Sequence, residues 1–253
     1  PGGAQAMIRQ GALQDFPPDV ILAQHVMPEL ECGKAGFRPG ACMASTDEIL
    51  ITVQGKGGHA AMPHQLVDSV LIASHMIVAL QQIASRMAPA SVPTVLSFGK
   101  VEANGTHNII PPQVKLMGTF RTMNEDWRRE AHGKIRKLCI SVAEAMGAGC
   151  EVEIRKGYPM VENHSNTTHE ALLSAQAFLG EQQVVGLEPQ MTAEDFTYFA
   201  RQAPATLYRI GTGGRNGKHT HSLHSPQFTL DETALKTGMG LMAWLTLTFF
   251  DAT

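Results

Sequence analysis

The side chains in this sequence best suited to acid, base or metal chemistry are its histidines, which number 11 among 253 residues. Imidazole titrates near neutral pH and is a good ligand for zinc, cobalt or manganese. His75, His132, His164 and His169 fall on predicted helices or in polar loops, and we interpret them as surface or hydrogen-bonded core residues. The other histidines lie in predicted loops or strand ends, where binding and catalytic groups concentrate.

Two histidine segments are candidates for metal binding. His25 follows an apolar run at residues 20–23 and is predicted to lie at the C-terminal end of a buried parallel strand, where open α/β sheets place ligands. A hydrogen-bonded histidine at a sheet edge would produce the same pattern. His219, His221 and His224 share one loop, and such a cluster fits either a metal site or a solvated polar loop. The spacing alone does not decide between these interpretations.

Two loops combine turn residues with a polar side chain. His59 follows Gly57 and Gly58, so the backbone could approach a substrate closely and the imidazole could donate to a developing oxyanion. The alternative is a glycine turn with an incidental histidine. Asn108 lies in a second loop, predicted to join the two central strands of the same module, and its side chain could hold a substrate amide or carboxylate or cap the turn.

Charged residues supply two further candidates. Arg121 stands in an otherwise alternating strand, where it is either a bidentate clamp for a carboxylate or an ordinary exposed charge. Glu194 and Asp195 are predicted to open a helix over residues 192–202 with Thr192 as its N-cap. Acidic residues in a first turn are expected from the helix dipole alone.

Composition excludes several classes of function. Lys and Arg number 20 and Asp and Glu 23, for a net charge of −3 without a basic run, so neither nucleic acid nor an anionic membrane is an expected partner. With 43% hydrophobic residues the chain can build a core. It contains no Gly-x-Ser-x-Gly, Walker or Rossmann glycine motif, which argues against a nucleophilic serine or a nucleotide site. Four cysteines without a Cys-x-x-Cys pair favour a reduced, cytoplasmic location.

The periodicity of apolar residues predicts the elements that position these side chains. An order of strand, helix, two strands, helix and strand in the middle of the chain is the signature of a ferredoxin-like module. We therefore predict an α+β module at residues 44–156, inserted between two pieces of an α/β domain at residues 1–43 and 157–253. The outer pieces contain fewer strands than a complete doubly wound domain, so further sheet is expected before residue 1.

Six short motifs occur in an order that resembles a known family. The motifs are QHVMP (24–28), GKGGHAAMP (55–63), HNIIP (107–111), GTFRT (118–122), AEDF (193–196) and LHSP (223–226). Together they resemble the aminoacylase and carboxypeptidase-like dinuclear metallopeptidases, in the branch of hippurate hydrolase, bacterial N-acyl-amino-acid amidohydrolases and plant auxin-conjugate hydrolases. The resemblance runs over the whole chain.

The resemblance implies a fold and a metal site. An α/β zinc-peptidase-like domain, incomplete in this chain, is interrupted by an α+β ferredoxin-like lid that also forms a homodimer interface. His25 and His224 correspond to two ligands of a pair of divalent metal ions, which could be zinc, manganese, cobalt or nickel. Glu194 corresponds to a residue near the metals that does not bind them.

The same resemblance implies a function for each candidate residue of the lid. His59 is similar to the histidine that reaches into the partner subunit's site and stabilises a tetrahedral oxyanion. Asn108 and Arg121 are similar to residues that hold the scissile acyl oxygen or the terminal carboxylate of the substrate. The implied function is hydrolysis of the amide bond of a small N-acyl-amino acid or peptide by a metal-activated water.

The sequence departs from the family at its front. The Cys-Gly-His-Asp-type ligand loop of the family and its Glu-Glu pair, which supplies the general base, are not among these residues. We therefore expect the chain to correspond to the C-terminal part of the enzyme, to bind metal weakly and to hydrolyse no acyl-amino acid.

Two alternatives remain open. The chain could be a non-catalytic dimerisation or ligand-binding module in which His25 and His224 are relics. Within the same family, it could be a dipeptidase or deacetylase, because the pocket that chooses the acyl group lies largely outside the motifs.

Overall fold

The computed structural model describes residues 2–214 and 221–251 of the chain, which form two compact units. Unit 1 consists of Pro1–Met43, Val161–Gln190 and Glu194–Thr253, and unit 2 of Ala44–Met160 and Met191–Ala193. The expected inserted segment, residues 44–156, lies inside unit 2, which also includes residues 157–160 and 191–193.

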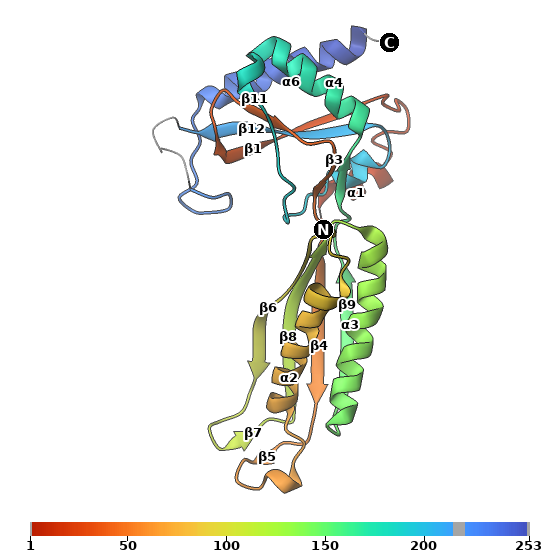
Figure 1. Cartoon of the computed structure of the whole chain (residues 1–253), viewed down its shortest axis with the longest axis vertical. Coiled ribbons are helices and arrows are strands. Elements are labelled where there is room, and N and C mark those ends of the chain that lie inside the picture. Colours follow the sequence, from red (N-terminus) through yellow and green to blue (C-terminus); the bar gives the residue numbers. More distant parts are fainter. Residues whose placement is uncertain (1, 215–220, 252–253) are drawn as a thin grey trace. The chain divides into compact units, whose positions relative to one another are not determined.

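Unit 1 is built on a mixed four-stranded sheet in the order β1-β12-β2-β11 (Figure 1). β1 runs parallel to β12, and β2 runs parallel to β11, but β12 and β2 are antiparallel. β2 is a three-residue strand in a stretch rich in glycine and proline, residues 33–40, and such a composition is typical of a loop, so the mixed character of the sheet was not predictable from the longer strands. The strands are β1 (Ile21–Glu31), β2 (Ala35–Phe37), β11 (Val184–Gly186) and β12 (Ala205–Gly213).

The two faces of this sheet pack against different elements. Side chains alternate along a strand, so Tyr208 and Ile210 join one core with α4 and α6, while Leu207 points to a second core on the opposite face. Figure 1 shows α4 and α6 together on one face of the sheet. The remaining elements of unit 1 are α1 (Gly3–Arg9), β3 (Gly40–Met43), β10 (Val161–Asn163), α4 (Ser165–Leu179), η3 (Glu181–Gln183), α5 (Thr197–Ala200) and α6 (Thr233–Asp251), with β3 and β10 forming an antiparallel pair.

β1 is longer than predicted, and both β1 and β12 run through residues typical of turns. β1 continues through Pro28 to Glu31, with an irregular register after Met27, so the prediction that His25 ends its strand is wrong: His25 lies near the middle. Proline is tolerated at such irregularities because no ladder hydrogen bond is lost there. β12 continues through Gly211 to Gly213, in a glycine-rich stretch whose composition is typical of a loop. A Cβ atom at Gly211 would lie 1.9 Å from the carbonyl oxygen of Glu31, so the close approach of the two strands requires glycine.

Unit 2 is an antiparallel sheet in the order β6-β8-β4-β9, with α2 and α3 on one face (Figure 1). β6 is therefore an edge strand, and the prediction that the Asn108 loop joins two central strands is wrong: it joins an edge strand to a central one. The larger elements are β4 (Asp47–Gln54), α2 (Ser69–Gln82), β6 (Thr94–Ala103), β8 (Gln113–Thr122), α3 (Glu125–Ala145) and β9 (Gly149–Lys156). The smaller ones are β5 (Gly58–His59), η1 (Pro63–Gln65), the π-helical turn η2 (Ile83–Met87) and β7 (Ile109–Ile110).

The core of unit 2 follows from the alternating pattern of its strands. On β4 every second side chain is buried, and the two helices cover that face. Asp68 and Asn124 cap α2 and α3 by accepting hydrogen bonds from backbone N–H groups of the first turns. Ser69–Met87 is long and apolar enough to cross a membrane by composition alone, but its buried residues belong to this core, as in the core helix of a globular unit. The central buried residues are Ile49, Ile51, Val53, Ile72, Met76, Leu80, Val114, Leu116, Phe120 and Ile135.

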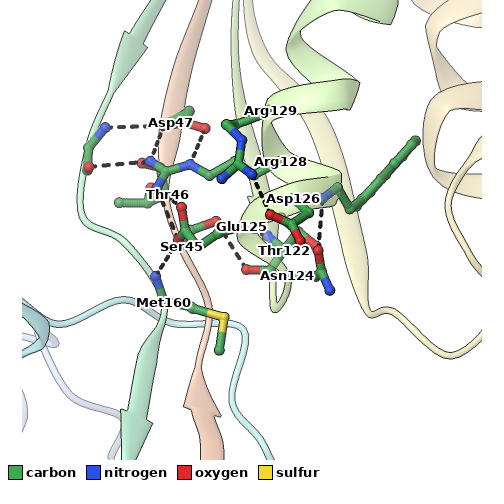
Figure 2. Close-up of polar contacts among 12 residues, drawn as sticks. Ser45, Thr46, Asp47, Thr122, Asn124, Glu125, Asp126, Arg128, Arg129 and Met160 are labelled. Atoms are coloured by element: carbon green, nitrogen blue, oxygen red, sulfur yellow. Dashed lines mark hydrogen bonds and ion pairs between the residues drawn. The ribbon is translucent and has the colours of Figure 1, made fainter. Parts of the chain in front are cut away.

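A buried charge network joins β4 to α3 (Figure 2). The Asp47 carboxylate accepts from Nε of Arg128 at 2.9 Å and also from Nη2, and it contacts Nε2 of His132 at 2.6 Å. Nη1 of Arg128 donates to Glu125, and the backbone N–H of Gly157 donates to Asp47. His132, interpreted from sequence as a structural residue, thus packs beside a buried ion pair.

Candidate functional site

His25 and Glu194 come together in unit 1, although 169 positions along the chain separate them. His25 lies on β1, and Glu194 precedes the short helix α5. Nε2 of His25 faces Oε2 of Glu194 at 4.0 Å, and both side chains are about one third exposed, at 33% and 27%. A ligand could therefore reach the space between them.

A hydrogen bond sets the tautomer of His25. Nδ1 lies 2.8 Å from the carbonyl oxygen of Val26, which can only accept, so Nδ1 carries the proton of the neutral ring. Nε2 is then left with its lone pair directed toward Glu194. Histidines that bind metals typically donate their other ring N–H to a carbonyl or carboxylate in this way, so His25 fits the role of a metal ligand.

Glu194 and Asp195 do not open the helix predicted over residues 192–202. The only helix in that stretch is α5, which begins at Thr197, after both acids. Oε1 of Glu194 accepts from the backbone N–H of Asp195, and Asp195 accepts from the N–H of Ala4 at 2.9 Å, in the first turn of α1. The expected pairing of an acid with a helix N-terminus therefore occurs, but at a helix distant in sequence.

The second predicted ligand, His224, is not brought to this pair. It is exposed, and at φ 65° it is the one non-glycine residue in the described part of the chain with a positive φ. Among the described residues no group of three His, Cys, Asp or Glu side chains is close enough to hold a metal ion. His221 is also exposed, and His219 lies outside the described residues.

In unit 2 the His59 and Asn108 loops pair with each other. His59 on β5 is opposite Ile109 on β7, and the N–H of Ala60 donates to the carbonyl oxygen of Asn108 at 2.9 Å. A Cβ atom at Gly57 would lie 2.6 Å from the carbonyl oxygen of Ile110, so glycine is needed for this contact. The structure thus brings together two residues that the sequence placed in separate loops.

Local hydrogen bonds also orient these two polar side chains. Nδ1 of His59 accepts from the backbone N–H of Ala61 at 3.1 Å, so the neutral ring carries its proton on the exposed Nε2. Oδ1 of Asn108 accepts from the Thr106 hydroxyl at 3.0 Å, which leaves its NH₂ group as the outward donor. Both side chains present donors, as the stabilisation of an oxyanion requires.

Arg121 lies far from this pair within the same unit. His59 and Asn108 are beyond the end of the sheet at which β8 begins, and Figure 1 shows β5 and β7 there. Arg121 is near the other end of β8, where Nη1 donates to the carbonyl oxygen of Met191 at 3.1 Å. Eight residues separate Gln113 from Arg121, or about 27 Å at about 3.4 Å per strand residue. One small substrate cannot contact Asn108 and Arg121 of the same unit.

Arg209 was not predicted as a site residue. It pairs with His25 across β1 and β12, points to the same face of the sheet and is only 6% exposed. Burial lowers its pKa, and Cys42, Glu194 and Glu29 oppose that effect. A single charge inside the otherwise apolar strand pattern TLYRIG (206–211) was the available signal.

Comparison with known proteins identifies the family. The sequence model of Peptidase family M20/M25/M40 matches residues 1–247. Bacillus subtilis (strain 168) YhaA, named as an amidohydrolase, is 35% identical over 98% of this chain and 62% of YhaA. The N-acetyldiaminopimelate deacetylase of Streptococcus sanguinis (strain SK36) is 33% identical over 92% of this chain and 60% of that enzyme. This chain therefore spans about three fifths of each relative.

A solved structure supports the same assignment. The Bacillus subtilis YXEP protein, described as a dinuclear metal binding peptidase from the M20 family, superposes with a TM-score of 0.80 at 28% identity. The match covers 99% of this chain and 62% of that structure. The expected resemblance to dinuclear metallopeptidases and the α/β peptidase fold are confirmed.

Proposed function

This chain belongs to Peptidase family M20/M25/M40, and on that basis we propose that it contributes to a metal-dependent amidohydrolase acting on N-acyl-amino acids or small peptides. The observation that carries the proposal is the pair formed by His25 and Glu194. The proton on Nδ1 is held by a carbonyl, so Nε2 faces a carboxylate as a free metal ligand.

Two divalent ions, when bound, would activate a water molecule and polarise the amide carbonyl of the substrate. His25 is the proposed ligand that the geometry supports, and the carboxylate of Glu194 would orient it or join the ligands. His224 is a proposed ligand on the resemblance alone, because the structure does not bring it to this pair. Nε2–H of His59 and the NH₂ group of Asn108 are the proposed donors to the developing oxyanion. Arg121 would hold a substrate carboxylate.

We further propose that unit 2 is a ferredoxin-like lid that forms a homodimer. Its chain order of strand, helix, two strands, helix and strand supports the first part. The distance of about 27 Å along β8 supports the second, because Arg121 and the His59–Asn108 pair must then serve different active sites. An oxyanion donor from one subunit would complete the site of its partner.

A deacetylase is the preferred form of the activity, and the named N-acetyldiaminopimelate deacetylase is the observation that favours it. A dipeptidase remains the alternative within the family, and a non-catalytic module with the same fold is the alternative outside it. The identity of the metals and the cytoplasmic location stay predictions from the sequence, as does the absence of nucleic-acid and membrane partners.

Zinc binding tests the ligand assignment directly. Titration of the purified 253-residue chain with Zn²⁺ should show weak binding, because most coordination positions would be left to solvent. His25→Ala and His224→Ala should each reduce it by about tenfold or more, which is the cost typical of disturbing a metal site. His75→Ala is the matched control, since His75 is an exposed histidine on α2. Equal affinity in all four proteins would refute the assignment.

Hydrolysis requires a second assay. The chain alone should release no amino acid from a panel of N-acetyl, N-benzoyl and dipeptide substrates, since it contains no Glu-Glu pair. A chimera that adds the part of YhaA not covered by this chain should release amino acid and lose activity with a chelator. A folded chimera that binds two zinc ions but cleaves no substrate would favour the non-catalytic module.

A further inference from the structure

Arg209 is a buried cation whose hydrogen bonds are incomplete. Its side chain extends from β12 to the face of the sheet that also bears His25, and it is 94% buried. Nη2 lies 3.2 Å from Oε1 of Gln190 and 2.9 Å from Sδ of Met43. Nη1 is fully buried and has no hydrogen-bond partner among the described residues. A buried guanidinium N–H without an acceptor is costly, so a ligand that supplies one is favoured.

Arg209 lines a small pocket of unit 1. The pocket is small and partly open to solvent, with a cavity volume of about 20 Å³, so it can receive one small polar group such as a single carboxylate but not a whole substrate. Its wall comes from strands and turns of unit 1 alone. The lining residues are Arg38, Cys42, Met43, Leu187, Glu188, Gln190, Leu207 and Arg209.

Two positive charges face this pocket. Arg38 is held in place by hydrogen bonds from Nε to the carbonyl oxygen of Ala41 and from Nη1 to that of Leu187. The carbonyls do not neutralise it, and neither Arg38 nor Arg209 forms an ion pair with a described residue. Burial raises the pKa of the Cys42 thiol to about 11 although both guanidinium groups act to lower it, so the thiol adds no negative charge.

One acidic residue also borders the pocket. Glu188 is exposed, so its negative charge is screened by water, whereas the charge of Arg209 is not. Glu194 and Glu29 also act on Arg209 but do not line the pocket. Two guanidinium groups against one exposed carboxylate therefore leave the lining of the pocket positive.

We propose that the Arg209 pocket is a binding site for a small carboxylate, which accepts a hydrogen bond from Nη1 of Arg209 and is attracted by Arg38. A planar carboxylate matches the planar fork of guanidinium donors better than a spherical ion does. Assigning that carboxylate to a substrate or product of the amidohydrolase rests on the proposed function, but the binding site itself does not.

Ligand-observed NMR titrations test the site without metal or catalysis. Acetate, succinate, inorganic phosphate and chloride are added at equal ionic strength to the purified chain, and an apparent Kd is measured for each. Acetate and succinate should bind and chloride should not. Arg209→Met should weaken carboxylate binding by about tenfold or more, because it removes a charge-assisted hydrogen bond. Circular dichroism verifies that each variant is folded.

Two further variants keep the test decisive if Arg209→Met does not fold. Arg209→Lys keeps the charge but loses the fork and should weaken binding severalfold. Glu188→Gln removes the negative charge at the rim and should strengthen carboxylate binding severalfold. Arg136→Met, an exposed arginine on α3, should change nothing.

Three outcomes would overturn the proposal. Carboxylates that bind no better than chloride would show that the pocket is not a carboxylate site. Phosphate binding through Arg209 without carboxylate binding would replace the ligand class. Equal carboxylate binding by wild type, Arg209→Lys and Arg209→Met would place the ligand elsewhere. None of these outcomes depends on zinc binding at His25 or on hydrolysis.

Discussion

Hydrogen bonds to single backbone groups orient two imidazoles in opposite ways in this chain. Nδ1 of His25 donates to the carbonyl oxygen of Val26, so its Nε2 is an acceptor suited to a metal. Nδ1 of His59 accepts from the N–H of Ala61, so its Nε2 is a donor suited to an oxyanion. The same residue type thus acquires two different chemical roles from contacts within two positions along the chain.

Asp47 provides a prediction on pH dependence. Burial acts to raise the pKa of its carboxyl, but hydrogen bonds and charge from Arg128 and His132 outweigh burial and lower the pKa from 3.8 to about 2. The ionised form therefore stabilises the folded state above about pH 4, and this contribution is lost as pH falls toward 2. At about 1.4 kcal/mol per pKa unit it amounts to about 2 kcal/mol.

Asp47→Asn measures this contribution. At pH 6 we expect it to reduce the free energy of unfolding of unit 2 by about 3–5 kcal/mol, since Arg128 is left buried without its partner. The difference from wild type should shrink between pH 4 and pH 2. Urea unfolding, followed by Trp127 fluorescence in a W244F background, gives both values.

Asp126→Asn is the control for this measurement. Asp126 pairs with Arg129 on the exposed side of α3, and such pairs contribute no more than about 1 kcal/mol (Figure 2). A difference between Asp47→Asn and wild type that stays constant from pH 6 to pH 2 would contradict the assigned pKa.

Strand pairing in unit 1 depends on glycine at places where the sequence indicated a loop. Gly211 and Gly213 lie in β12 against the backbone of β1, where a Cβ atom would be 1.9 Å from the carbonyl oxygen of Glu31 and 2.3 Å from that of Pro28. A run of glycines between helix and strand patterns resembles a flexible connection. Here it extends a buried strand and keeps β1 and β12, which bear His25 and Arg209, in register.

Gly211→Ala should therefore destabilise unit 1. Because the clash is with backbone, which cannot move aside like a flexible side chain, we expect a loss of about 1–3 kcal/mol. Gly186→Ala is the control, since Gly186 ends β11 and a Cβ atom there would contact nothing within 4 Å. Its effect should stay within about 0.5 kcal/mol. Urea unfolding monitored through Trp244 in a W127F background compares the two, and equal effects would argue against the close approach.

Unit 2 exposes an edge strand and an apolar helix face, which bear on the oligomeric state of the whole molecule. β6 is a ten-residue edge strand, and the neighbouring α2 exposes the apolar residues Val70, Leu71 and Val78. An unprotected edge strand is a template for pairing with another chain, and an exposed apolar helix face adds area to such a contact. These features support the proposed homodimer through unit 2.

Sedimentation measures this assembly. At micromolar concentration, sedimentation equilibrium of the wild-type chain should give a molar mass twice the 27.3 kDa of one chain. Val78→Asp should shift it to monomer, because Val78 is 72% exposed on α2 and a charge there would be buried in the dimer. Leu173→Asp, on α4 of unit 1 and 51% exposed, should remain dimeric. A monomeric wild type, or a dimeric Val78→Asp, would contradict the proposed interface.

Local patterns in the sequence predicted most of the unit 2 elements. The alternation along β4 depends on neighbours in the chain, so the periodicity rule applies to it directly. The capping rule failed at residues 192–202, where the acid Asp195 caps α1 and not the segment that follows it. A cap that comes from a distant segment leaves no pattern in the local sequence.

The ordered motifs in the sequence were sufficient to identify the family and to single out His25, His59, Asn108 and Arg121. The order of motifs along the chain can be recognised without knowing the distances between them in the folded protein. The motifs could not show that His25 faces Glu194, that His59 lies beside Asn108, or that Arg121 lies about 27 Å along β8 from the end of the sheet beyond which that pair lies. They also could not show that Arg209 is buried with an unsatisfied Nη1. Each of these facts depends on strand register and on contacts between segments far apart in the chain, which are determined by the packing of the folded units.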